Sequence, residues 1–125
     1  IGLAAWIVSC FKMWGDCGED VESRFTKDEL LTTVMTYWLT GSIPSAIRLY
    51  AETLESGLFG PPDTFCKTPT GVAQFKDIAR PTREWAEQNY NIVQWNEFDR
   101  GGHFAALEEP EILIGEIRRF FRPLR

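Results

Sequence analysis

The sequence predicts an α/β fold in which two parallel strands and their helices follow an all-helical segment. First, residues 67–125 alternate in the order strand, helix, strand, helix, which is typical of a parallel sheet with right-handed crossovers. Second, residues 1–60 carry helix-type patterns only. Third, the only histidine, His103, follows two glycines just after the second predicted strand. Ligands bind at the carboxyl ends of strands in open α/β sheets, so this turn is a candidate site.

The bulk composition is that of one small globular domain. The 125 residues are 44% hydrophobic and 25% charged. The formal net charge of −5 and the lack of a Lys/Arg patch argue against a nucleic-acid partner, and we expect the arginines near the end to form a solvated helix face. We expect no membrane span and no signal peptide. The first residue is not Met, so we expect the chain to be part of something longer.

The three cysteines, Cys10, Cys17 and Cys66, are odd in number and fit no zinc spacing. We therefore expect free thiols in a reducing compartment, the cytoplasm, and neither a metal nor a cofactor. A catalytic cysteine is the weaker alternative.

The first segment predicts three helices. Apolar residues at spacings of three and four indicate a helix over residues 1–14, whose broad stripe predicts a mostly buried helix. The break at 15–20 fits neither a calcium loop, since position twelve counted from Asp16 is Lys27, nor a nucleophile elbow, since glycine directly precedes Asp16. A solvated acidic loop is the preferred interpretation.

Thr26 is a candidate N-cap, and Glu29 lies three residues later, as in a capping box, so a helix is predicted over 28–39. A further helix begins near Pro44, which suits the first turn because its missing N–H costs nothing there. This helix carries Tyr50 on its apolar side.

A loop rich in glycine and proline at 57–63 marks the change to the second segment, residues 61–125. Its predicted elements are a strand over 70–75, a loop over 76–81, a helix over 82–89, a strand over 91–98 and a last helix from Pro110 to Pro123. Parallel sheets are covered on both faces, and two strands cannot provide this alone. We therefore expect residues 67–125 to be the last quarter of a larger α/β domain, with residues 1–60 as a helical cap over its active edge.

Asp77 and His103 occupy equivalent places, because each follows a predicted strand at the same edge of the sheet. They are 26 positions apart in sequence, but neighbouring parallel strands lie only ~4.8 Å apart. A carboxylate beside a histidine holds the tautomer of the ring and stabilises its charged form, and the order acid then histidine is that of α/β hydrolases. The alternatives are a turn-forming aspartate before a helix and a structural loop histidine.

Several stretches, in order and over nearly the whole chain, resemble the C-terminal part of an epoxide hydrolase of the α/β-hydrolase fold, in the branch related to microsomal and fungal enzymes. These stretches are 2–7, 37–41, 46–52, 75–77, 81–85 and 101–108, of which the last is the most specific.

The resemblance implies a role for each matching residue. His103 would activate water, Asp77 would be the acid that supports it, and Tyr50 would be one of two tyrosines that hydrogen-bond the epoxide oxygen. From its helix position alone Tyr50 would be a core tyrosine. Trp38 and Phe104 either line an apolar pocket or pack in the core. The implied substrates are an epoxide and water.

The sequence also departs from the resembled family. The nucleophilic aspartate on its elbow, the oxyanion-hole loop and the second tyrosine have no match in these 125 residues. We therefore expect no turnover by this chain alone, and its partner to be the N-terminal core of the same enzyme; a homodimer is left open. Two other interpretations remain: another cap-bearing α/β hydrolase, either a haloalkane dehalogenase or an esterase, and a non-catalytic remnant of the fold.

Overall fold

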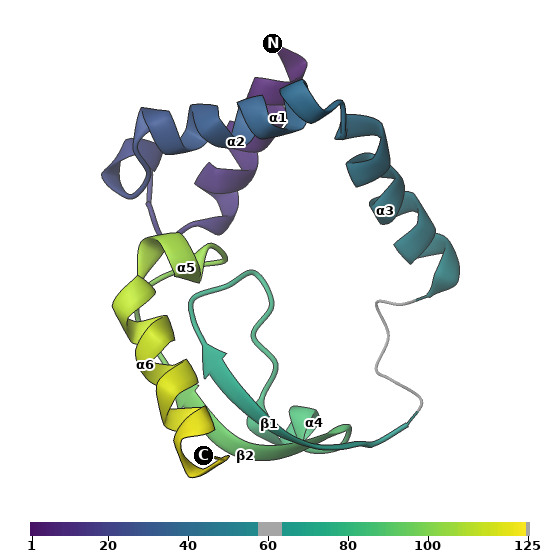
Figure 1. Ribbon diagram of the computed structural model, residues 1–125, viewed down its shortest axis with the longest axis vertical. Helices are drawn as coiled ribbons and strands as arrows, with labels where there is room; N and C mark the ends of the chain where they lie inside the picture. Colours follow the sequence, from purple (N-terminus) through teal and green to yellow (C-terminus); the bar gives the residue numbers. More distant parts are fainter. Residues whose placement is uncertain (58–63, 125) are drawn as a thin grey trace.

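A computed structural model describes residues 1–57 and 64–124 (Figure 1). The first segment consists of α1 (Gly2–Trp14), a 3-10 turn (Val21–Ser23), α2 (Lys27–Thr40) and α3 (Ile43–Ser56). The second consists of β1 (Cys66–Gln74), α4 (Arg83–Ala86), β2 (Tyr90–Glu97), α5 (Ala105–Glu108), α6 (Pro110–Phe121) and a 3-10 turn (Arg122–Leu124). The predicted order of helices and strands is confirmed. The predicted loop at 57–63, apart from Gly57, and the boundary between the segments lie outside the described residues.

The two strands pair in parallel, as predicted, with Gly71 opposite Gln94 and Gln74 opposite Glu97. The predicted start of β1 was wrong, because β1 begins at Cys66 rather than at residue 70. Residues 67–69 are exposed and show no apolar alternation, and the register shifts before Pro69, so the sequence pattern gives no strand signal there. The helix predicted over 82–89 is the single turn α4.

The helical segment is held together by a small apolar core between α1, α2 and the turn that joins them. Its buried members are Ile7, Phe11, Cys17, Phe25 and Leu30. Only two residues of α1 are buried, so the prediction that this helix is mostly buried was wrong. The apolar stripe of α1 is broad, but its neighbours bury only Ile7 and Phe11. No helix within residues 1–57 and 64–124 combines the length and the apolar character that crossing a membrane requires.

Helix α2 begins with the predicted capping box. The Thr26 hydroxyl accepts a hydrogen bond from the Glu29 backbone N–H at 3.2 Å, and the Glu29 carboxylate accepts one from the Thr26 backbone N–H at 2.8 Å. The backbone N–H and then the hydroxyl of Thr26 lower the pKa of Glu29, because both bonds favour its ionised form.

Helix α6 lies along the sheet (Figure 1). The ring of Phe120 packs on Gly71 so closely that a Cβ there would be 2.5 Å from it. Further along α6, the buried carboxylate of Glu116 accepts hydrogen bonds from the side-chain amides of Gln94, at 2.9 Å, and Asn96. These contacts fix α6 on the strands whose carboxyl ends carry the candidate site.

Candidate active site

The loops that leave the two strands are joined by backbone hydrogen bonds. The N–H of Phe98 donates to the carbonyl of Gln74, and the N–H of Lys76 donates to the carbonyl of Gly101, both at 2.8 Å. These bonds continue the pairing of β1 and β2 beyond the strands. They bring Asp77 and His103 to one edge of the sheet, as the sequence predicts.

Asp77 and His103 are in direct contact. His103 Nδ1 lies 2.9 Å from Asp77 Oδ1, which also accepts a hydrogen bond from the Ile78 backbone N–H at 2.6 Å. An ionised carboxylate only accepts hydrogen bonds, so the proton of the neutral ring is on Nδ1 and the lone pair is on Nε2. The His103 side chain is 40% exposed, which leaves the ring accessible to water. The arrangement can therefore take a proton from a water molecule at Nε2 and stabilise the resulting imidazolium.

Two aromatic rings flank the histidine. The rings of Trp14 and Phe104 lie edge-on to His103, with centroids at 5.2 Å and 5.1 Å. Phe104 in turn stacks on Phe11 with centroids 4.0 Å apart and meets Phe25 edge-on at 5.8 Å. The residue after the histidine is thus anchored in the core of the helical segment, so the two segments pack together at the site. Phe104 also lines the cavity described next, so both predicted roles apply to it.

A cavity of about 400 Å³ opens between the helices beside this aromatic wall. Its lining includes Trp6, Cys10, Trp14, Tyr37, Tyr50 and Phe104. The volume falls in the range of small-molecule sites, and the lining is largely apolar. Burial raises the pKa of the Cys10 thiol, which disfavours the thiolate that a catalytic cysteine needs.

Tyr50 borders this cavity and does not pack in the core. It is 48% exposed and meets the edge of Trp6 at a centroid distance of 6.5 Å. In the described part of the chain it makes no hydrogen bond to Asp77 or His103. Trp14 and Phe104 lie between them, because both rings line the Tyr50 cavity and both contact the ring of His103. Trp38 is 66% exposed and lines a separate apolar pocket near the N-terminus, so of its two predicted roles the pocket is confirmed and the core is not.

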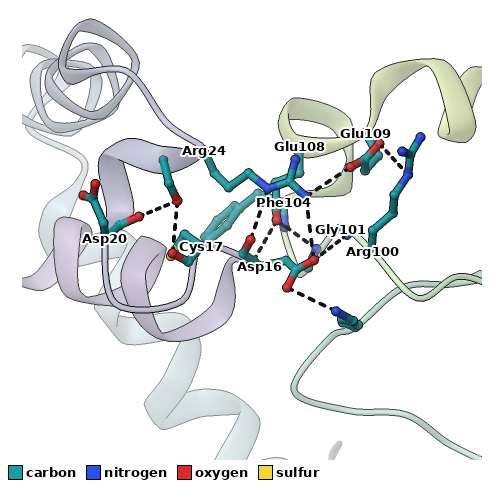
Figure 2. A network of polar contacts seen from close by, with 12 residues as sticks. Asp16, Cys17, Asp20, Arg24, Arg100, Gly101, Phe104, Glu108 and Glu109 are labelled. Atoms are coloured by element: carbon teal, nitrogen blue, oxygen red, sulfur yellow. Dashed lines mark hydrogen bonds and ion pairs between the residues drawn. The ribbon is translucent and has the colours of Figure 1, made fainter.

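The loop after α1 contributes to the site, which sequence reasoning missed. The prediction of a solvated acidic loop holds for the exposed residues 18–20 and is wrong for Asp16. Its Oδ2 accepts a hydrogen bond from the Gly101 backbone N–H at 3.0 Å, and its carboxylate lies 3.5 Å from Lys76 Nζ and 3.7 Å from Arg24 Nη2 (Figure 2). A contact between residues 85 positions apart leaves no local sequence signal.

Glu108 is the other residue that sequence reasoning missed as part of the site. It is buried and accepts backbone hydrogen bonds around the histidine turn (Figure 2). Its only sequence signal is its place at the end of the stretch 101–108. Within the described residues, no group of three or more His, Cys, Asp and Glu side chains is placed to hold a metal ion.

No protein-family model matches the chain. Curated proteins do match it. Over 99% of this chain, the sequence is 42% identical to a candidate epoxide hydrolase of Stigmatella aurantiaca. Over 96% of this chain, it is 39% identical to epoxide hydrolase 1 of Sus scrofa. The chain spans 28% and 29% of the lengths of these two relatives.

Solved structures of epoxide hydrolases are also similar to this chain. The juvenile hormone epoxide hydrolase of the silkworm Bombyx mori superposes with a TM-score of 0.78 at 33% identity, over 99% of this chain and 35% of that one. The Aspergillus niger epoxide hydrolase superposes with a TM-score of 0.73 at 31% identity, over 98% and 30%. The predicted fold class is thus confirmed: the chain has part of the α/β-hydrolase fold, two parallel strands with their helices, preceded by helices.

Proposed function

We propose that these 125 residues supply the water-activating and epoxide-binding groups of an epoxide hydrolase, which converts an epoxide to a vicinal diol. The observation that carries the proposal is the hydrogen bond between His103 Nδ1 and Asp77 Oδ1, two residues that line a hollow of about 310 Å³. The rings of Trp14 and Phe104, which lie edge-on to His103, also line the separate apolar cavity that Tyr50 borders. The similarity to epoxide hydrolases along nearly the whole chain supports it.

In the proposed first step, a carboxylate outside these 125 residues attacks one carbon of the epoxide. A carbon–oxygen bond of the ring breaks and an ester forms. The Tyr50 hydroxyl hydrogen-bonds the epoxide oxygen and stabilises the emerging alkoxide. A phenol suits this task because its ordinary pKa, about 10, keeps it protonated at neutral pH.

In the second step, His103 Nε2 takes a proton from a water molecule, and the hydroxide formed attacks the carbonyl carbon of the ester. The bond between that carbon and the diol oxygen breaks, and the carboxylic acid that forms gives its proton to the departing oxygen, which restores the nucleophilic carboxylate. The imidazolium gives its proton to the alkoxide left by ring opening, so the diol leaves and His103 is neutral again. Asp77 stabilises the imidazolium while this happens. Residues 1–60 act as the cap that excludes bulk water, and the predicted cytoplasmic location is part of the same proposal.

Turnover of styrene oxide by the complete encoded protein tests the proposal. His103→Gln and Asp77→Asn are expected to abolish or strongly reduce diol formation. Tyr50→Phe separates this activity from that of an esterase or a dehalogenase, because only epoxide opening needs the phenol: we expect a large loss on styrene oxide and no change on p-nitrophenyl acetate. Unchanged diol formation in Tyr50→Phe would reject the role of Tyr50, and no diol formation by the unaltered protein would reject the function.

A further inference from the structure

Glu108 is a buried carboxylate that binds backbone N–H groups of two chain segments. Its Oε2 accepts from the N–H of Asp16 at 2.7 Å and from that of Gly102 at 2.9 Å, and its Oε1 accepts from the N–H of Phe104 at 3.0 Å (Figure 2). Only 8% of the residue is exposed. Within the described part of the chain it forms no ion pair, in contrast to the neighbouring Glu109, which pairs with Arg24 and Arg100.

A buried charge without a cation is costly unless hydrogen bonds replace its hydration. Three N–H donors do so here, and hydrogen bonds to an ionised acceptor are stronger than neutral ones. The ionised carboxylate therefore favours the backbone conformation in which all three N–H groups point toward it. If the histidine turn moved, the backbone N–H groups would no longer reach the Glu108 carboxylate, and its buried charge would lose its hydrogen bonds.

The two donors from the histidine turn flank the catalytic candidate on both sides. Gly102 and Phe104 are bound by Glu108, and the N–H of His103 itself donates to the carbonyl of Trp14 at 3.0 Å. All three consecutive N–H groups are thus engaged. Because the backbone on either side of His103 is held in place, the point from which its side chain reaches Asp77 is fixed, and the hydrogen bond of Nδ1 to Asp77 then orients the ring.

We propose that Glu108 is a positioning residue for the water-activating step: by binding the N–H groups of Gly102, Phe104 and Asp16, it holds the histidine turn against the end of α1 and keeps His103 aligned on Asp77. The proposal rests on the function proposed above. Glu108 does not touch the substrate in it, and acts only through the position of His103.

The test is Glu108→Gln in the complete encoded protein. The variant keeps the shape of the side chain but replaces one acceptor oxygen by a donor. In single-turnover experiments with styrene oxide, we expect the rate constant for ester hydrolysis to fall by about 10- to 100-fold, the range expected when a catalytic group is misplaced by a fraction of an ångström to an ångström. The rate constant for ester formation, which does not involve His103, should stay the same.

Glu116→Gln is the matched control. Glu116 is also a buried glutamate held by hydrogen bonds, but its partners are Gln94, Asn96 and Arg119 on the sheet and α6. We expect it to lower stability without changing the hydrolysis step. Equal slowing of ester formation and hydrolysis by Glu108→Gln, or the same slowing by Glu116→Gln, would overturn the proposal. If Glu108→Gln does not fold, Glu108→Asp is the second variant. It keeps the charge, but its shorter side chain moves the carboxylate oxygens away from the N–H groups, so we again expect slower ester hydrolysis and unchanged ester formation.

An NMR measurement that needs no turnover tests the role of Glu108 independently of the proposed function. A proton shared by a histidine Nδ1 and a carboxylate gives a low-field NMR resonance, which His103→Gln would identify by its loss. We expect Glu108→Gln to shift or broaden this resonance and Glu116→Gln to leave it unchanged. An unchanged resonance in Glu108→Gln would overturn the positioning role. Failure of the unaltered protein to form an ester would overturn the proposed function, while the resonance still tests Glu108.

Discussion

Replacing Gly102 by alanine forces apart the two segments that meet at the histidine turn. A Cβ at this position would lie 2.5 Å from the carbonyl oxygen of Trp14 and 2.7 Å from the backbone nitrogen of Asp16. Both neighbours are backbone atoms, so no side chain can rotate away to make room. Overpacking of this kind costs about 1–3 kcal/mol, and loss of the hydrogen bond from His103 N–H to the Trp14 carbonyl adds about 1 kcal/mol. We therefore expect Gly102→Ala to lower the free energy of unfolding by about 2–4 kcal/mol.

Urea denaturation of the complete encoded protein, followed by tryptophan fluorescence, measures this change. Gly115→Ala is the matched control, because a Cβ at this position in α6 would meet no atom within 4 Å beyond its own turns of helix backbone. Alanine is the better helix former, so the control should raise stability by up to about 1 kcal/mol. If Gly102→Ala were as stable as the unaltered protein, the close backbone approach of the turn to the end of α1 would be refuted.

The remaining predictions concern the core and the start of α2. Phe25 is fully buried, so Phe25→Ala should lower the free energy of unfolding by about 3–5 kcal/mol, while Phe65→Ala, at a half-exposed position, should change it little in the same urea titration. Thr26→Ala removes the side-chain cap and should cost about 1 kcal/mol in urea denaturation. Hydrogen bonds from Thr26 lower the pKa of Glu29 in the folded protein. The ionised carboxylate therefore stabilises the fold at pH values above the ordinary glutamate pKa, and this stabilisation is lost as the pH falls through the lowered pKa of the folded state. Thermal melts should therefore show a deficit for Glu29→Ala at neutral pH that narrows in acid; a deficit independent of pH would contradict this.

The features that the sequence predicted correctly depend on local rules or on sheet topology. Thr26 and Glu29 predicted the start of α2 because a capping box is complete within four residues. The meeting of Asp77 and His103 followed from parallel pairing, which brings the ends of both strands to one edge without further information.

The features that it did not predict depend on contacts between distant residues. Asp16 was assigned to a solvated loop because its partner Gly101 is 85 positions away. Glu108 had no signal beyond its place in the stretch 101–108, since its carboxylate binds backbone N–H groups, which every residue except proline carries. The early start of β1 was missed because residues 67–69 are exposed and show no apolar alternation, although the strand they belong to pairs with β2 from Cys66 onward.

The most direct test of the proposed function is the intact mass of the His103→Gln variant of the complete encoded protein after mixing with styrene oxide. If His103 activates the water that hydrolyses an ester, the variant should still react once and should accumulate a protein heavier by the mass of one styrene oxide, whereas the unaltered protein should return to its own mass and release diol. A variant that forms no adduct, or that releases diol as fast as the unaltered protein, would contradict the proposed role of His103.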